Sequence, residues 1–219
     1  MVVDRFRDPL LTAKETARHL LIPRSTLHHW LAEEAAGAPL VHQVAPERRG
    51  SPSVPFVAVV EAYVLRSLRD LGLGKRKIRE AAAAVRGEFG TDYGLATKQI
   101  ATDGIDIFLH YADGDLARLG DRQRPIREVL GGYLRHITWE GDDDFPSSLR
   151  LRQYPDIAPV VIDPRFGWGA PIIQQNRVPV DAVVKMWLAG DSLRDVAYEY
   201  DLEPDQVEAI CRSAQRVAA

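Results

Sequence analysis

The sequence predicts a mainly α-helical fold with small β elements, in the α+β class. Two observations lead to this prediction. Apolar residues recur at helical spacing near both ends of the chain, where short corners separate the helices. The middle third instead carries hairpin and turn signals between short apolar runs. We therefore expect a winged helix-turn-helix over residues 1–90, an α+β segment of hairpin and helix over 91–153, and a three-helix, helix-turn-helix-like bundle over 154–219.

The first helix is expected to begin at about Ala13. Thr12 and Glu15 have the spacing of a capping box, in which the hydroxyl accepts from a first-turn amide and the carboxylate reaches back to the cap residue. Pro23 prevents a continuous helix, so a second helix opens at Pro23 or Arg24. Its inward positions are the apolar residues at helical spacing, Leu27, Trp30 and Leu31.

The outer face of this second helix carries five candidate DNA-binding residues, Arg24, Ser25, Thr26, His28 and His29. Arg24 is the best candidate for reading a base, because a guanidinium can grip guanine with two hydrogen bonds. Ser25 and Thr26 either contact nucleic acid or cap the helix locally. His28 and His29 lie about 100° apart around the helix, which does not suit a zinc pair. We expect them to contact solvent or phosphate.

A basic wing is expected to follow the corner. Leu40–Val44 alternates like a strand, and Val54–Phe56 is its expected partner. The hairpin would carry Arg48 and Arg49 at its tip, where a DNA backbone can lie, so both are predicted DNA contacts.

A second basic cluster opens a later helix. The break Gly72-Leu73-Gly74 ends a helix over about 57–71, and the next helix begins with Lys75, Arg76 and Lys77 before an alanine-rich stretch. Lys75 and Arg76 complete the predicted DNA contacts.

The middle third is expected to mix strands and helix. Asp113-Gly114 is a strong hairpin signal between apolar runs at Ile105–Tyr111 and Leu116–Leu119. A helix from Pro125 to about His136 and strands at Ile137–Glu140 and Leu149–Gln153 should follow. The acidic run at 141–144 is most simply a solvated turn.

Three helices are expected at the end of the chain. The first runs from Pro179 to Leu188, the second from Asp191 or Ser192 to Tyr200, and the third starts at Glu203-Pro204-Asp205. The first should bury an apolar stripe, Val183, Val184, Trp187 and Leu188.

Charge separates the two halves of the chain. Residues 1–90 carry 14 Lys and Arg against 10 Asp and Glu, a balance of +4, whereas residues 91–219 carry 14 against 21, a balance of −7. The front half suits a polyanion, and the rear, at −2 over 149–219, suits a protein partner.

Composition and motifs narrow the classes of function. Cys211 is the single cysteine, which excludes an intramolecular disulfide and fits the cytoplasm. No apolar run approaches the length of about 18 residues that a membrane span needs. The sequence contains no nucleophile elbow, HExxH pair or complete P-loop, so we expect neither an enzyme nor a bound cofactor or metal.

Two parts of the chain, one near each end, resemble known families. LLTAKETARHLLIPRSTLHHW and PFVAVVEAYVLRSLRDLGLGKRKIREA resemble the DNA-binding domain of MerR-type regulators. The rear stretch is similar to a small trihelical family found in antitoxins, at Asp163-Pro164, Gly169, Pro171, Ile173, Arg177, Pro179-Val180, Ala189-Gly190 and Ser192. It departs from that pattern at Gln175-Asn176, where the family usually has Gly-Thr. The combination looks like a VapB-type antitoxin of a VapBC toxin–antitoxin pair.

The resemblance implies a binding protein with two partners. One is operator DNA, through which the chain would repress its own operon. The other is a PIN-domain ribonuclease toxin, whose carboxylate cluster and Mg²⁺ an antitoxin can block with a cation, and Arg165 and Arg177 are the candidate toxin contacts. A homodimer is expected, because once one DNA-binding domain is bound, the linked second domain has a raised effective concentration near the DNA.

Two rival functions remain open at this point. A stand-alone MerR-like regulator would share the front part but bind a small ligand in the middle third, over residues 91–153, which could also serve as a dimer platform. A purely structural interaction protein would show no salt-dependent affinity for DNA. The operator, the RNA target of the toxin, the stoichiometry and any DNA contact by the rear bundle are not specified by the sequence.

Overall fold

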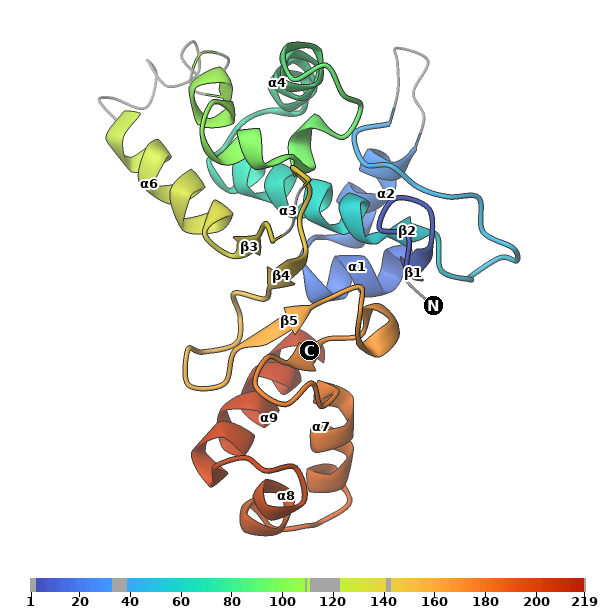
Figure 1. The fold of residues 1–219 in the computed structure, drawn as a ribbon, viewed down its shortest axis with the longest axis vertical. Helices are drawn as coiled ribbons and strands as arrows, with labels where there is room; N and C mark the ends of the chain where they lie inside the picture. Colours follow the sequence, from blue (N-terminus) through green and yellow to red (C-terminus); the bar gives the residue numbers. More distant parts are fainter. Residues whose placement is uncertain (1–2, 33–38, 109, 111–122, 141–142, 219) are drawn as a thin grey trace.

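The computed structural model describes residues 3–32, 39–108, 110, 123–140 and 143–218. Figure 1 shows an upper body, in which α1, α2, α4 and α6 surround α3, and a lower bundle of α7, α8 and α9. Short strands run between the two. The mainly helical α+β fold with an N-terminal helix-turn-helix is confirmed.

The first corner forms as expected. Helix α1 spans Ala13–His19, with the Thr12 and Glu15 capping box in place, and α2 spans Arg24–Leu31. Leu21 turns the chain with a left-handed φ of 51°. The three inward residues of α2 are buried, Leu27, Trp30 and Leu31.

The predicted strand pair of the wing is wrong. Strand β2 (Val54–Pro55) pairs antiparallel with β1 (Pro9–Leu11), and not with Leu40–Val44, which forms no strand. The physical reason is that the backbone there has other partners, since Val41 donates to the Trp30 carbonyl and His42 to the Glu61 carboxylate. One hydrogen bond, from the Val44 amide to the Ser53 carbonyl at 2.8 Å, closes the loop over 44–53, which we call the wing loop.

Helix α3 (Phe56–Asp70) is the centre of the upper body, and its buried residues extend over nearly four turns. Gly72, with a φ of 85°, reverses the chain into α4 (Lys75–Glu88). The 3₁₀ turns η1 (Gly94–Ala96) and η2 (Lys98–Ala101) follow, and η1 packs against α3 and α4.

The middle third contains one further correction. The expected strand over Ile105–Tyr111 is helical over residues 104–108, because Phe108 is buried one turn after the buried Gly104, which is helical rather than alternating burial. The expected turn at Asp113-Gly114 and the run Leu116–Leu119 lie outside the described residues. Helix α6 (Gln123–Leu134) forms close to its expected position and packs against α3.

Four short antiparallel strands connect the upper body to the lower bundle, in the order β3 (Ile137–Thr138), β4 (Ser148–Arg150), β5 (Val160–Ile162) and β6 (Ile172–Ile173). The sheet therefore crosses residue 153, where the sequence suggested a boundary. In the acidic run before β4, Asp143 forms an ion pair with Arg5 and Asp144 is exposed.

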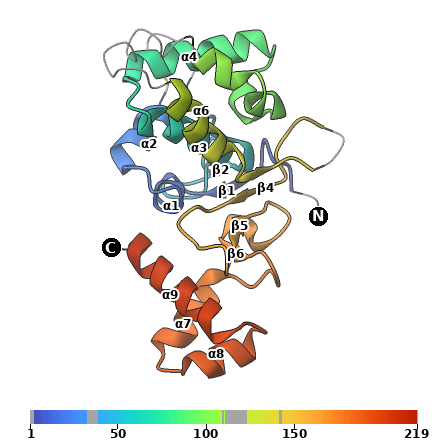
Figure 2. The same ribbon diagram turned by 90° about the vertical axis from the view of Figure 1, so that its left-hand side faces the viewer.

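The lower bundle contains α7 (Val180–Leu188), α8 (Leu193–Glu199) and α9 (Pro204–Ala218), close to the expected bounds. Val183 of the expected stripe is buried, and Val184 and Trp187 are partly buried against the core. Leu188, the last residue of α7, is 65% exposed. Figure 2 shows the C-terminal end of α9 next to α1, and the two helices are in contact. No helix among the described residues has both the length and the apolarity to cross a membrane.

Candidate nucleic-acid interface and C-terminal surface

The polar face of α2 is open to solvent. Arg24, Ser25, His28 and His29 are exposed, whereas the opposite face of the helix is buried in the upper body. The Arg66 guanidinium donates to the Leu20 carbonyl at the end of α1, which fixes the corner that orients α2. The helix thus presents four of the five predicted residues outward from a rigid base.

Thr26 is the exception among the five. It is only partly exposed, and its hydroxyl accepts a hydrogen bond from the Arg69 guanidinium of α3. This contact joins α2 to the end of α3, so the structure places Thr26 in an internal contact beside the open face. Sequence reasoning did not identify Arg69, because the pair is separated by 43 residues.

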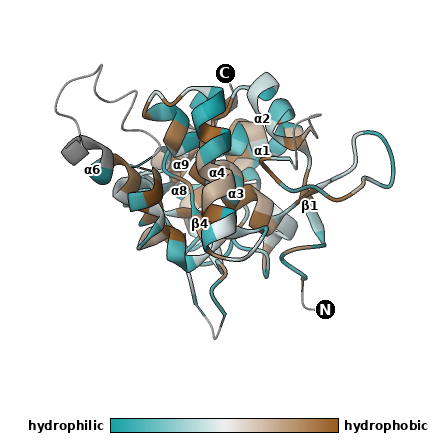
Figure 3. Ribbon diagram, turned by 90° about the horizontal axis from the view of Figure 1, so that it is seen from above, coloured by the Kyte–Doolittle hydropathy of each residue, from teal (hydrophilic) through white to brown (hydrophobic). Residues whose placement is uncertain are grey.

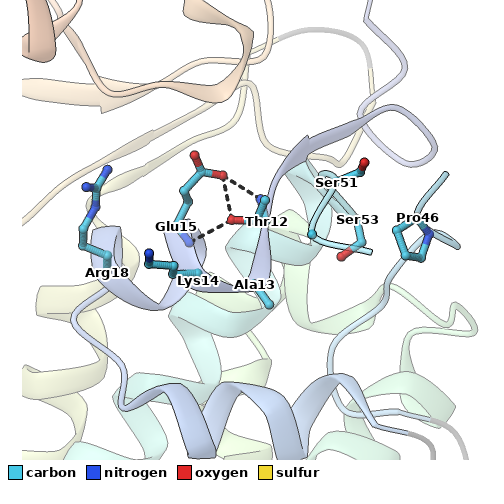
Figure 4. A pocket seen from close by; sticks show the side chains of 9 residues that line it. Thr12, Ala13, Lys14, Glu15, Arg18, Pro46, Ser51 and Ser53 are labelled. Carbon is cyan, nitrogen blue, oxygen red and sulfur yellow. Dashed lines mark hydrogen bonds between the residues drawn. The ribbon is translucent and has the colours of Figure 1, made fainter. Parts of the chain in front are cut away.

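The wing loop carries Arg48 and Arg49 on its exposed part, next to Gly50 with a φ of 88°. Figure 3 shows this loop projecting from the body, with hydrophilic residues at its tip. Between the loop and α1 lies an open hollow of about 480 Å³, lined by the residues that Figure 4 labels.

The free charges at this hollow are positive. Thr12 donates to the Glu15 carboxylate from its amide at 2.9 Å and from its hydroxyl at 2.8 Å. Burial opposes ionisation of Glu15, but these bonds outweigh it and hold the pKa of Glu15 below its ordinary value. The carboxylate therefore stays charged and committed to the cap, whereas Lys14 and Arg18 remain exposed on the same side of α1.

The start of α4 lies beside α2. A hollow of about 220 Å³ is lined by Thr26 and His29 from α2, by Arg69, and by Lys75 from α4. Lys75 is exposed, as is Arg76, which forms an ion pair with Glu80 at 3.5 Å. The structure therefore brings Lys75 together with the outer face of α2.

A buried carboxylate anchors the root of the wing loop. Glu61 of α3 is fully buried, and it accepts from the His42 amide at 3.0 Å and from the His42 ring at 2.9 Å. Arg86 of α4 lies 3.5 Å from Glu61 and donates to the carbonyls of Pro39 and Leu40. Sequence reasoning missed this group, although a glutamate within an apolar helical stretch was a signal that could have found it.

The two candidate toxin contacts converge on one buried acid. Arg165 binds Asp163 with two hydrogen bonds, of 2.9 and 2.8 Å, and Arg177 lies 4.0 Å from the same carboxylate. The Asp163 side chain is 1% exposed, whereas those of Arg165 and Arg177 are 52% and 41% exposed. The Arg177 guanidinium also lies 4.8 Å from the centre of the Phe166 ring. Arg165 also lies 3.9 Å from the carboxylate of Glu140, which is 64% exposed, so the two arginines belong to a surface of mixed charge beside the Phe166 ring.

Asn176, one of the two residues at which the sequence departs from the trihelical family pattern, has a structural role. Asn176 donates to the Tyr200 carbonyl at 2.6 Å and accepts from the Val178 amide at 3.2 Å. It therefore connects the turn after β6 to the end of α8. Arg177 follows with a left-handed φ of 64°.

Comparison with known proteins matches both ends of the chain to families. Residues 9–82 match a model described as "Putative DNA-binding HTH domain", and residues 160–212 match one described as "Protein of unknown function (DUF433)". The chain is similar to the "Putative antitoxin VapB45" of Mycobacterium tuberculosis, with 32% identity over 93% of this chain and 92% of that protein. It is also similar to the crystal structure of Rv2018 from Mycobacterium tuberculosis, with 31% identity, a TM-score of 0.78, and coverage of 94% of this chain and 99% of that one.

Proposed function

Because this chain belongs to the VapB-type antitoxin family, we propose that it binds operator DNA with its upper body and neutralises a PIN-domain ribonuclease toxin with its lower part. The role is one of binding and not of catalysis. By binding its own operator the chain represses the operon that encodes it, in the cytoplasm, where that DNA lies.

The observation that carries the DNA-binding half is the open polar face of α2. No described segment of the chain covers Arg24, Ser25, His28 or His29, and none of them forms an ion pair with a described residue. Pro23 provides no side-chain cap, so the first N–H groups of α2 are available to a phosphate. A helix held by its apolar face, with its polar face free, can enter a major groove.

Two further cationic segments support the same face. Lys75 borders α2 directly, and the wing loop places Arg48 and Arg49 on a projection from the body. In this arrangement Arg24 reads a base, while Ser25, His28, His29 and the basic side chains of the wing loop and α4 contact phosphates. We propose that Thr26 acts through Arg69, by holding α2 in position, and that the chain works as a homodimer with two reading helices.

The toxin-binding half rests on the two exposed arginines of the lower part. Arg165 and Arg177 keep about half of their side chains exposed although both face Asp163. The buried carboxylate and the Phe166 ring hold the two guanidinium groups in fixed positions, which lowers the entropy cost of meeting a carboxylate of the toxin.

The DNA-binding half is tested by titrating promoter DNA with the chain at several salt concentrations. The parent should lose affinity steeply as salt rises, and the variant Arg24→Ala/Arg48→Ala should bind more weakly, with the slope of log K against log salt reduced by about 1 to 2. Arg212→Ala is the matched control, because Arg212 is an exposed arginine of α9 that pairs with Glu208. A double variant that binds as tightly as the parent would overturn the assignment.

The toxin-binding half is tested by co-expressing the chain with the product of the adjacent open reading frame. We expect the two to co-purify and the chain to inhibit RNA cleavage by its partner. Arg177→Ala should weaken the complex, whereas Arg212→Ala, which removes an exposed cation of α9 paired with Glu208, should leave it unchanged.

A further inference from the structure

A crevice of about 390 Å³ lies where the upper body meets the lower bundle. Arg18 and His19 of α1 line one side, and Tyr154, Trp168 and Val184 line the other. Beside it the C-terminal end of α9 contacts α1, as Figure 2 shows. None of the DNA-binding residues considered above lines it.

The edge of the crevice is a strained loop that displays an indole. Gly167, Trp168 and Gly169 have successive left-handed φ values of 67°, 51° and 84°. A Cβ on Gly167 would lie 2.8 Å from the Ile172 side chain, and one on Gly169 would lie 2.7 Å from Leu10. Both positions therefore require glycine, and the backbone packs tightly against β1. The result is that Trp168 is held rigidly while 72% of it is exposed to solvent.

Strain of this kind costs free energy at a non-glycine residue, and natural chains retain it mostly where it serves binding or catalysis. An exposed tryptophan on a rigid support is the side chain most enriched among the residues that dominate protein interfaces. The loop thus has the properties of an interface anchor.

The floor of the crevice contains a largely buried polar side chain. His19 is only 8% exposed, and no described residue forms a hydrogen bond with its ring. Burial, assisted by the neighbouring Arg18, lowers the pKa of His19 to about 4, so the ring is neutral at pH 7 and offers one donor and one acceptor. Its ring nitrogens do not belong to the enclosed side-chain atoms of the described residues that lack a hydrogen bond, so they open to solvent in the crevice. A bound partner can form hydrogen bonds with them there.

Charged side chains of both signs line the crevice. Glu15 is committed to the cap of α1, and Asp181 pairs with Lys185 at 2.5 Å. Arg18 is exposed and forms no ion pair with any residue that the structure describes. The two lining carboxylates disfavour a nucleic-acid backbone, while Arg18 favours an acidic side chain.

We propose that this crevice docks an extended segment of the toxin, which presents a carboxylate to Arg18, a hydrogen-bonding group to His19 and an apolar side chain to Trp168. The inference rests on the proposed antitoxin function and adds a second contact to it. Continuity supports the toxin as the occupant, because Trp168 belongs to the same loop as Arg165 and Phe166. A toxin segment that binds over Arg165 and Phe166 can therefore continue along the surface of the chain into the crevice.

The test measures the affinity of the full chain for the purified product of the adjacent open reading frame. Trp168→Asn removes the indole and suits the left-handed backbone, which asparagine tolerates. We expect it to weaken binding by ten-fold or more, and Arg18→Glu to weaken it by a similar factor. Tyr198→Ala, which truncates a side chain that is 91% exposed on α8, is the matched control and should bind within about two-fold of the parent.

The outcomes separate the two proposals. If the parent chain does not bind this partner, the proposed antitoxin function fails. If the parent binds and both crevice variants bind equally well, the crevice proposal alone is overturned. Promoter binding by Trp168→Asn should match that of the parent, which shows that the variant is folded. Loss of self-association in analytical ultracentrifugation, with unchanged partner affinity, would assign the crevice to a second copy of this chain and contradict the proposal.

Discussion

The helix pair α1–α2 near the start of the chain and the bundle that contains α8 near its end are built alike, but their exposed faces carry different charges. In both, a short helix is capped by a hydroxyl, Thr12 for α1 and Ser192 for α8, and the helices bury apolar stripes. The exposed face of α2 carries an arginine and two histidines without an acid. The exposed face of α8 mixes Arg194 with Asp195 and Glu199. Similar corners can therefore serve different partners, because side chains and not the fold select what binds.

The largest expected effect is a loss of stability in the upper body, with the lower bundle left intact. Glu61→Ala leaves Arg86 and His42 without their buried carboxylate, and removing one partner of a buried ion pair costs about 4 kcal/mol. We expect a clear decrease in the free energy of unfolding, measured by urea denaturation. Glu199→Ala, at an exposed position of α8, is the control and should change stability little. Equal stability of the two variants would contradict the anchoring role of Glu61.

The second effect is a pH dependence of stability that comes from His19, which lies at the junction between the two regions. The pKa of His19 falls from 6.5 to about 4 on folding, so the folded state disfavours the charged ring. Its contribution is fully present above pH 6.5 and is lost progressively as the pH falls to about 4, reaching about 3 kcal/mol. His19→Leu should therefore lose less stability than the parent between pH 7 and pH 4. Parallel pH profiles for the two proteins would refute this.

The third effect comes from reversing one charge on α2 and, for comparison, one on α8. Arg24→Glu on α2 should reduce promoter affinity by about 2 kcal/mol, because the variant would lose the base contact proposed for Arg24 and would repel phosphates. Arg194→Glu on α8 removes an exposed arginine from the other corner and should leave promoter binding unchanged. Fluorescence anisotropy with labelled promoter DNA measures both. A similar loss for the two variants would mean that both corners contact DNA.

The smallest effect compares the two caps. Thr12→Ala and Ser192→Ala each remove a side-chain acceptor from a first-turn amide, at a cost of about 1 kcal/mol. Thermal unfolding should show a decrease for both variants, and only Thr12→Ala, which also releases Glu15 beside the wing loop, should alter DNA binding. Altered DNA binding by Ser192→Ala would contradict the division between the two regions.

Local signals predicted much of the fold. The capping box at Thr12, the corner at Pro23, the glycine break before α4 and the three terminal helices depend on residues close in sequence, and all were predicted within a few residues. The error in the wing involves a distant partner. Strand β2 pairs with β1, which lies about 40 residues earlier, and no local pattern indicates that choice.

In the candidate site too, features that depend on local sequence could be predicted, and features that depend on distant contacts could not. The exposure of Arg24, Ser25, His28 and His29 follows from helical periodicity, so it could be predicted. The Thr26–Arg69 contact and the burial of His19 depend on how separate elements pack. Periodicity carries no information on such contacts. The display of Trp168 depends on three left-handed residues in succession, for which the two flanking glycines were the only sequence signal.

The most direct test of the division between the two regions is hydrogen–deuterium exchange of the full chain, recorded with promoter DNA and separately with the product of the adjacent open reading frame. We expect DNA to slow exchange in α2, the wing loop and the start of α4, and the protein partner to slow exchange over 163–184 and in the second half of α1. Protection of α8 and α9 by DNA, or of α2 by the protein partner, would contradict this division.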